Sequence, residues 1–419
     1  MIRTRIIVAG VGAALAATVL AATPAHASPG ATATVGIDGN LHYDGLPGVA
    51  NEVTLTKTGT TVEIDDLVTI TPGGACEYPD ETDDTIVTCT VSAVAPDLSV
   101  EPGDFNDMVT LAGDGRWLVN LGSGSDTADL TDVTLSGSIV VGGTGNDLFI
   151  SGTQSEAYDG DAGTDTISYA TRDGAVIVDL GEGHGGNPDD EDFYEDIENA
   201  VGTPGGDVIT GTSGANRLDG GEGPDGLFGE GGNDLLVGGA GVDFFDGGPG
   251  TDTASYLGHA VGVTANLDGL QNDGAPGELD WIKDDIENLA GSSHGDSLTG
   301  NTSANVIYGE PCSPFCSSDG GDDTILGGGS NDTLYGYGGD DYLHGQAGAD
   351  TLSGGDGEDD LYGGSSADTL SGGNGDDYLS AGSGYDSLDG GSGLQDWCYA
   401  DDDGGTKANC EYPLIIVWP

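Results

Sequence analysis

The stretch "GGDGEDDLYGGSSADTLSGGNGDDYLS", residues 354–380, repeats one pattern every nine residues. Each copy has a glycine doublet, an aspartate four positions later and a leucine two positions after that aspartate. Written from its first glycine, the pattern is GGxGxDxUx, where U is a large apolar residue. So short and regular a period indicates a small structural unit that stacks on copies of itself.

Copies of this nonapeptide can be laid end to end over residues 142–168, 202–255 and 291–389, giving three, six and eleven copies. Position 8 is polar in none of them. Position 6 is aspartate in sixteen of the twenty copies: Asp147, Asp165, Asp207, Asp225, Asp234, Asp243, Asp252, Asp296, Asp323, Asp332, Asp341, Asp350, Asp359, Asp368, Asp377 and Asp386. The four exceptions are Glu156, Asn216, Asn305 and Pro314.

The composition limits the classes of partner. The chain has 419 residues, with 73 acidic against 8 basic residues and a formal charge of −65. Such a charge repels phosphate, which argues against nucleic acid and anionic membranes and favours cations as partners. Acidity and the small number of phenylalanines, 7, would by themselves suggest disorder, but the regular repeat argues against that interpretation.

The nonapeptide has a simple physical interpretation. Glycines at positions 1, 2 and 4 permit backbone angles with positive φ, and the following x-U-x segment is long enough only for a short strand. If two nonapeptides form one coil, position 8 points inward and the aspartates stack in two rows on the outside edges. Two carboxylates ~5 Å apart repel by ~3 kcal/mol at an effective dielectric constant of ~20. The coil therefore needs a divalent cation, and Ca²⁺ fits better than Mg²⁺, which retains its water.

These repeats resemble the haemolysin-type calcium-binding repeat of RTX proteins. The resemblance implies an all-β fold, a right-handed parallel β-roll, in which several Ca²⁺ ions bridge stacked turns. By this resemblance the sixteen position-6 aspartates are side-chain ligands. Asn216 and Asn305 would ligate weakly, the role of Glu156 is open, and Pro314 would supply no ligand.

A solvated turn residue is the alternative for each single aspartate, because Asp-rich and Gly-rich turns are common. Eleven copies in register argue against it. For Asp107 and Asp126, which lie before the repeats, the choice between ligand and turn residue stays open.

A longer duplication overlies the repeats. Residues 163–180 match 250–267, and residues 196–216 match 285–305. The two spacers between the repeat blocks, residues 169–201 and 256–290, therefore belong to the array, and the predicted roll covers residues 111–390.

The flanking regions break the period. Residues 28–110 alternate apolar and polar positions and predict a small β domain or a cap. Residues 391–419 predict a C-terminal cap, because a stack of coils must close its last one. A partner-docking strand is the alternative interpretation of its apolar end, Leu414, Ile415, Ile416, Val417 and Trp418.

The N-terminus predicts export. Residues 1–27 combine a basic start, an apolar run and the small-residue sequence "AHA", which is typical of a signal peptide cleaved after Ala27. No later apolar run is long enough for a membrane span. Six cysteines in an exported chain favour disulfides over zinc, since no CxxC pair occurs. Proximity in sequence favours the pairs Cys76–Cys89, Cys312–Cys316 and Cys398–Cys410.

These features predict a secreted, non-enzymatic protein that binds calcium ions and folds on binding them. The sequence "GSSHG" at 291–295 fits the GxSxG motif of hydrolases, but it lies inside a repeat, so we interpret Ser293 as a turn residue. Two alternatives remain. One is a calcium-stabilised extracellular enzyme acting on polysaccharide, with paired acids at 189–192, and the other is a calcium-dependent adhesin.

Overall fold

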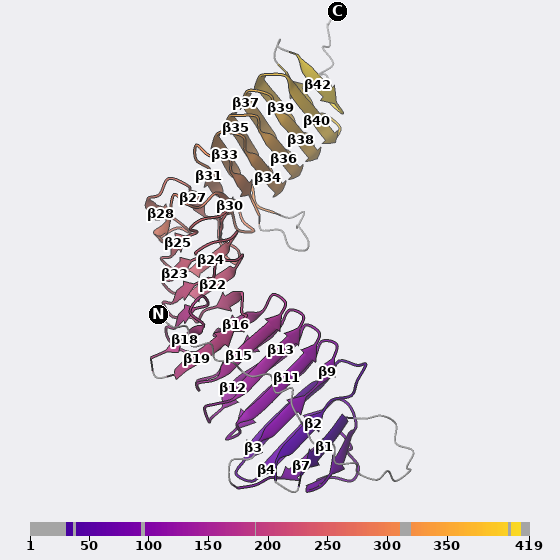
Figure 1. The fold of residues 1–419 in the computed structure, drawn as a ribbon. Helices are drawn as coiled ribbons and strands as arrows, with labels where there is room; N and C mark the ends of the chain where they lie inside the picture. Colours follow the sequence, from indigo (N-terminus) through magenta and orange to yellow (C-terminus); the bar gives the residue numbers. More distant parts are fainter. Residues whose placement is uncertain are drawn as a thin grey trace, which may run out of the picture.

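The computed structural model describes residues 31–36, 39–93, 97–188, 190–310, 320–400 and 404–411. These residues form strands and turns but no helix. Among them there is therefore no helix that could cross a membrane. Figure 1 shows one elongated stack of coils from the N-terminal end in indigo to the C-terminal end in yellow. The predicted signal peptide, the predicted Cys312–Cys316 pair, Pro314 and the apolar segment 414–418 lie outside the described residues.

The strands form three sheets, here numbered 1 to 3. Sheet 1 contains β1 (Ala31–Val35), β2 (Leu41–Asp44), β5 (Ile70–Gly73), β8 (Leu98–Glu101), β9 (Gly103–Asp104), β11 (Trp117–Ser123), β13 (Ile139–Thr144), β15 (Ala157–Ala162), β17 (Ile177–Asp179), β18 (His184–Asn187), β19 (Asp190–Glu195), β21 (Val208–Thr210), β23 (Gly226–Phe228), β25 (Phe244–Asp246), β28 (Gln271–Asp273) and β29 (Asp280–Ile282).

Sheet 2 contains β3 (Glu52–Thr58), β4 (Thr61–Asp66), β6 (Cys76–Glu77), β7 (Ile86–Thr90), β10 (Met108–Gly113), β12 (Thr127–Val133), β14 (Leu148–Ile150), β16 (Thr166–Ser168), β20 (Asn199–Val201), β22 (Arg217–Glu222), β24 (Leu235–Ala240), β26 (Thr253–Ser255), β30 (Asn288–Ala290), β32 (Val306–Tyr308), β34 (Thr333–Gly338), β36 (Thr351–Asp356), β38 (Thr369–Asn374), β40 (Asp386–Ser392) and β42 (Gly405–Ala408). Sheet 3 contains β27 (Thr264–Asn266), β31 (Ser297–Thr299), β33 (Thr324–Gly329), β35 (Tyr342–Ala347), β37 (Asp360–Ser365), β39 (Tyr378–Ser383) and β41 (Trp397–Tyr399).

Successive repeats alternate between two sides of the stack. In the C-terminal block β36 belongs to sheet 2, β37 to sheet 3 and β38 again to sheet 2. Each strand pairs in parallel with the strand two repeats away, so Leu352 lies beside Leu370 and Leu361 beside Leu379. Two nonapeptides therefore make one coil, and the predicted all-β parallel roll is confirmed.

The position-8 side chains form the core along the axis of the stack. Leu343, Leu361 and Leu379 are fully buried from sheet 3, and Leu334 and Leu388 are buried from sheet 2. Flanking residues of each short strand face outward, because side chains alternate between the faces of a strand. One large side chain per nonapeptide thus supplies the apolar burial of each coil.

Glycines at different positions of the repeat have different structural roles. Gly355 and Gly357, at positions 2 and 4, have φ angles of 131° and 148°, which favour glycine over any L side chain. Gly354, at position 1, has no such φ, which corrects our expectation for that position. A Cβ on Gly354 would lie 2.2 Å from Oδ2 of Asp359, so glycine at this position makes room for the carboxylate, although Ala381 occupies position 1 of the last copy.

The N-terminal region shares its sheets with the roll. Strand β3 pairs in parallel with β10, and β8 pairs in parallel with β11. Antiparallel pairs β3–β4 and β4–β7 lie at the end of this stack (Figure 1). The boundary that we expected near residue 110 falls inside β10, so the region extends the roll and covers its first coils.

Two of the three expected disulfides lie in described residues. Cys76–Cys89 joins β6 to β7 in the N-terminal region, and Cys398–Cys410 joins β41 to the residues after β42. Both close short loops at the two ends of the stack. Such cross-links limit fraying of the terminal coils, where neighbours are present on only one side.

Candidate functional site

The acidic side chains form two rows of hydrogen-bonded residues along the stack. In most steps the main-chain N–H of one member donates to a side-chain oxygen of the member in the next coil, over 2.6–3.1 Å. Two steps of row 1 differ, because Nδ2 of Asn216 and of Asn305 donates to the main-chain oxygen of Glu198 and of Glu287. Row 2 is interrupted after Asp192 and after Asp280, since Oδ1 of the next member, Asp207 or Asp296, accepts the main-chain N–H of Val176 or Val263 instead. Row 1 follows sheet 2 and contains Asp107, Asp126, Asp147, Asp165, Glu198, Asn216, Asp234, Asp252, Glu287, Asn305, Asp332, Asp350, Asp368 and Asp386. Row 2 follows sheets 1 and 3 and contains Glu156, Asp192, Asp207, Asp225, Asp243, Asp280, Asp296, Asp323, Asp341, Asp359, Asp377 and Asp396.

All sixteen predicted aspartates lie in these rows, eight in each. We expected them on the outside edges of the coil, but each is at most 4% exposed. The glycine turns pass over the carboxylates and cover them. Asp107 and Asp126, which the sequence left open, are also buried and begin row 1.

The second carboxylate oxygen, Oδ2, indicates what these aspartates can bind. In fourteen of the sixteen aspartates Oδ2 is buried and has no hydrogen-bond partner among the described residues. The exceptions, Asp207 and Asp296, each accept a main-chain N–H at Oδ2, from Thr203 and from Ser292. Buried carboxylate oxygens are normally hydrogen-bonded, so a long series of unpaired ones indicates donors for a ligand.

Burial in rows changes the acidity of these groups. Burial, with repulsion from Asp359, raises the pKa of Asp341 to about 8, and burial with repulsion from Asp341 raises the pKa of Asp323 to about 8. The pKa of Asp332 and that of Asp368 rise to about 7 for the same reasons. Without a positive partner, the rows therefore favour protons over charge.

The donor set fits a hard divalent cation. Carboxylate and carbonyl oxygens are the ligands that Ca²⁺ prefers. A Cβ on Gly142 would lie 2.3 Å from Oδ2 of Asp147 and 3.0 Å from the carbonyl oxygen of Gly160 in the next coil. The space that position-1 glycine leaves free is thus bordered by oxygens of both kinds.

A comparison with known families agrees with this geometry. The family model described as RTX calcium-binding nonapeptide repeat (4 copies) matches residues 136–167, 201–236, 222–254, 290–311, 317–352 and 353–388. These matched segments carry RTX calcium-binding nonapeptide repeats. No curated protein matches the chain.

The first row 1 repeat after each spacer carries asparagine in place of aspartate, at Asn216 and Asn305. Asn216 donates from Nδ2 to the main-chain oxygen of Glu198, and Asn305 donates in the same way to Glu287 over 2.7 Å. Their side-chain oxygens accept main-chain N–H groups. Each asparagine oxygen thus already accepts a main-chain N–H, and the weak ligation that we expected from these two residues stays a prediction.

Sequence reasoning missed the row members that the spacers supply. Asp192 and Asp280 accept the main-chain N–H groups of Glu156 and Asp243 in row 2, although both lie outside the RTX matches. The duplication does not mark them, because both lie between its matched pieces, residues 163–180 with 250–267 and residues 196–216 with 285–305. Without the nonapeptide spacing, these residues could not be told from a solvated acidic loop.

Proposed function

We propose that this chain is a secreted, non-enzymatic calcium-binding protein that folds when Ca²⁺ fills its two rows. The observation that carries the proposal is the series of buried Oδ2 atoms without hydrogen-bond partners. Each of these oxygens can act as a ligand for a cation. A charged oxygen that is buried without a partner destabilises the folded state.

The ligands that we assign are the fourteen predicted aspartates with a free Oδ2. They are Asp147, Asp165, Asp225, Asp234, Asp243, Asp252, Asp323, Asp332, Asp341, Asp350, Asp359, Asp368, Asp377 and Asp386. Asp207 and Asp296 belong to the predicted set, but backbone amides already use both of their oxygens. We therefore assign these two a structural role in the turn.

Binding and folding are coupled in this proposal. Neighbouring carboxylates in a row repel each other, and the main-chain donors in each row satisfy only one oxygen per aspartate. A cation between coils reverses the sign of this electrostatic contribution. Extracellular calcium is abundant enough to fill weak sites, which is consistent with an export signal at residues 1–27 and with disulfides.

Calcium titration of the mature chain, residues 28–419, tests the proposal by circular dichroism. We expect a β signal that appears cooperatively with Ca²⁺, is reversed by chelator and responds much less to Mg²⁺. A chain that stays equally folded after complete removal of metal would overturn it.

Two neighbouring aspartates give a matched control for this titration. Asp359 is buried in row 2, whereas Asp360 is exposed on β37. Asp359→Asn should shift the titration to severalfold higher calcium, because one donor is lost. Asp360→Asn makes the same chemical change and should leave the titration unaltered.

A further inference from the structure

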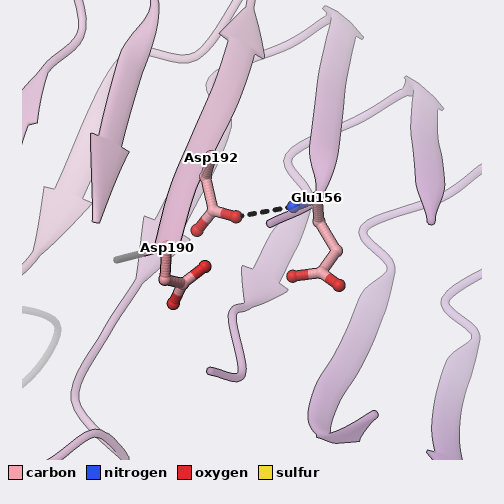
Figure 2. Close-up of side chains that lie close together, drawn as sticks. All are labelled: Glu156, Asp190 and Asp192. Atoms are coloured by element: carbon pink, nitrogen blue, oxygen red, sulfur yellow. Dashed lines mark hydrogen bonds between the residues drawn. The ribbon is translucent and has the colours of Figure 1, made fainter. Parts of the chain in front are cut away.

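A group of three carboxylates, two of them members of row 2, lies where the first spacer joins the roll. Glu156 precedes β15, and Asp190 and Asp192 lie on β19. One carboxylate oxygen from each lies within 4.8 Å of those of the other two. Figure 2 shows the three carboxylates gathered between β19 and the chain before β15, with Asp192 bonded to the Glu156 amide.

Unpaired oxygens face one another in this group. Glu156 is 2% exposed, and neither of its carboxylate oxygens has a hydrogen-bond partner among the described residues. Oδ1 of Asp190, which is 5% exposed, is also unpaired there. Three buried oxygens thus lack a donor, which is the state of an oxygen that binds a cation.

The charges around the group do not balance. Arg172 is the cation of the cluster, with Nη1 2.6 Å from Oδ2 of Asp190 and Nη2 3.1 Å from Oδ2 of Asp192. When all three carboxylates are ionised, Arg172 compensates one of them and leaves a net charge of −2. The packed tyrosines add no charge, because burial raises the pKa values of Tyr158, Tyr169 and Tyr194 far above their usual range.

We propose that Glu156, Asp190 and Asp192 bind one calcium ion at a site that joins the nonapeptide repeats to the first spacer, beyond the fourteen aspartates assigned above. The free pair of oxygens on Glu156 suits two-point ligation of Ca²⁺. Zinc prefers nitrogen and sulfur donors, and magnesium keeps several waters, for which a covered cluster has little room. The proposal rests on the proposed function only for the identity of the ion.

The site would fix the spacer to the roll. Strands β18 and β19 form an antiparallel pair, and β19 continues sheet 1 beside β15. An ion that joins Glu156 to two residues of β19 crosses this junction. Because the group is buried, the ion must enter before the junction closes.

Native mass spectrometry of calcium-loaded protein tests the site by counting bound ions. Glu156→Gln should bind one Ca²⁺ fewer than the unmodified chain. Glu191→Gln is the matched control, since Glu191 lies between the two aspartates on β19 but faces solvent. It should bind the full number.

The outcomes separate this inference from the proposed function. If Glu156→Gln keeps every ion while Asp359→Asn loses one, the Glu156 site is wrong and the rows remain calcium sites. If the unmodified chain binds no calcium, the proposed function fails as well. Should Glu156→Gln not fold, anomalous scattering from calcium in crystals of the unmodified chain gives the answer. We expect a peak among the three carboxylates, and its absence beside peaks along the rows would overturn the site.

Discussion

The two spacers, residues 169–201 and 256–290, place the same kind of residue in row 2 but compensate its charge differently. Each begins with a buried tyrosine, Tyr169 or Tyr256, and each later supplies an aspartate, Asp192 or Asp280, that accepts a row 2 amide. Row 2 starts again after each insertion, where Oδ1 of Asp207 and of Asp296 accepts a main-chain N–H from Val176 and from Val263.

The second spacer differs in its third carboxylate. Glu278 accepts the main-chain N–H of Ala275 at 2.8 Å and that of Gly241 at 3.3 Å, and it lies 3.3 Å from Nε2 of His259. Its oxygens are engaged, whereas Oδ1 of Asp190 in the first spacer is unpaired among the described residues. Row members keep unpaired oxygens at both junctions, Glu156 at the first and Asp243 and Asp280 at the second. The shared requirement is therefore an aspartate that accepts the row 2 amide of the preceding coil, while the surrounding charges can vary.

The largest expected effect is the pH dependence of the calcium-free fold, which should be similar at both spacers. Burial, then repulsion by neighbouring acids, raises the pKa values of Glu156 and of its counterpart Asp243 to about 8. Burial likewise raises those of Asp192 and Asp280 to about 6. In the unfolded chain such groups titrate near pH ~4, so the calcium-free folded state binds more protons and loses stability as pH rises.

We therefore expect the calcium-free chain to gain β signal as the pH falls from 8 to 5, measured by circular dichroism in chelator. Glu156→Gln and Asp243→Asn should each weaken this dependence to a similar degree. A much larger change in one variant would show that the two junctions are electrostatically unlike. A rise of β signal with increasing pH would contradict the assigned direction.

The second-largest expected effect is a loss of stability that should differ between the two spacers. Arg172→Met leaves Asp190 and Asp192 without their buried counter-charge, and we expect it to lower the free energy of unfolding by about 3–5 kcal/mol. His259→Met should cost about 1 kcal/mol, since its partner Glu278 is 20% exposed and has backbone donors. Urea unfolding at saturating calcium measures both, and equal losses would remove the proposed contrast.

The smallest effect concerns matched aromatic residues on the outer face. Phe193 and Trp281 are each 43% exposed, but Trp281 packs edge-on against Phe244 with ring centroids 5.1 Å apart. Phe193 lies beside Ala157. Trp281→Ala should cost about 1 kcal/mol more than Phe193→Ala, because an aromatic pair is lost. The same urea experiment measures the difference, and a larger loss for Phe193→Ala would contradict this assignment.

The period of the sequence was sufficient to predict the roll and its core. Leu361 and Asp359 recur at fixed positions, so the buried leucines and the acidic rows followed from counting. Counting could not predict that the turns bury Asp359, because the close approach of Gly354 is a property of the folded turn. The role of Asn216 was also hidden, since it depends on a carbonyl in the preceding coil.

Asp192 and Asp280 show a second limit of prediction from one sequence. They join row 2 through pairing of β19 and β29 with the roll, and no local spacing marks them. The N-terminal region shows the same limit, because the parallel pairing of β3 with β10 joins residues that are 56 apart. Long-range strand pairing of this kind leaves no period in the sequence.

The turns that follow the two spacers interrupt the series of aspartates with an unpaired Oδ2. At these turns Asn216 and Asn305 are neutral members of row 1, and the oxygens of Asp207 and Asp296 are all engaged by backbone amides. Each turn thus separates two stretches of aspartates whose Oδ2 has no hydrogen-bond partner among the described residues. We expect three separately loading compartments along the axis, so that loss of ions from one would unravel it without emptying its neighbours.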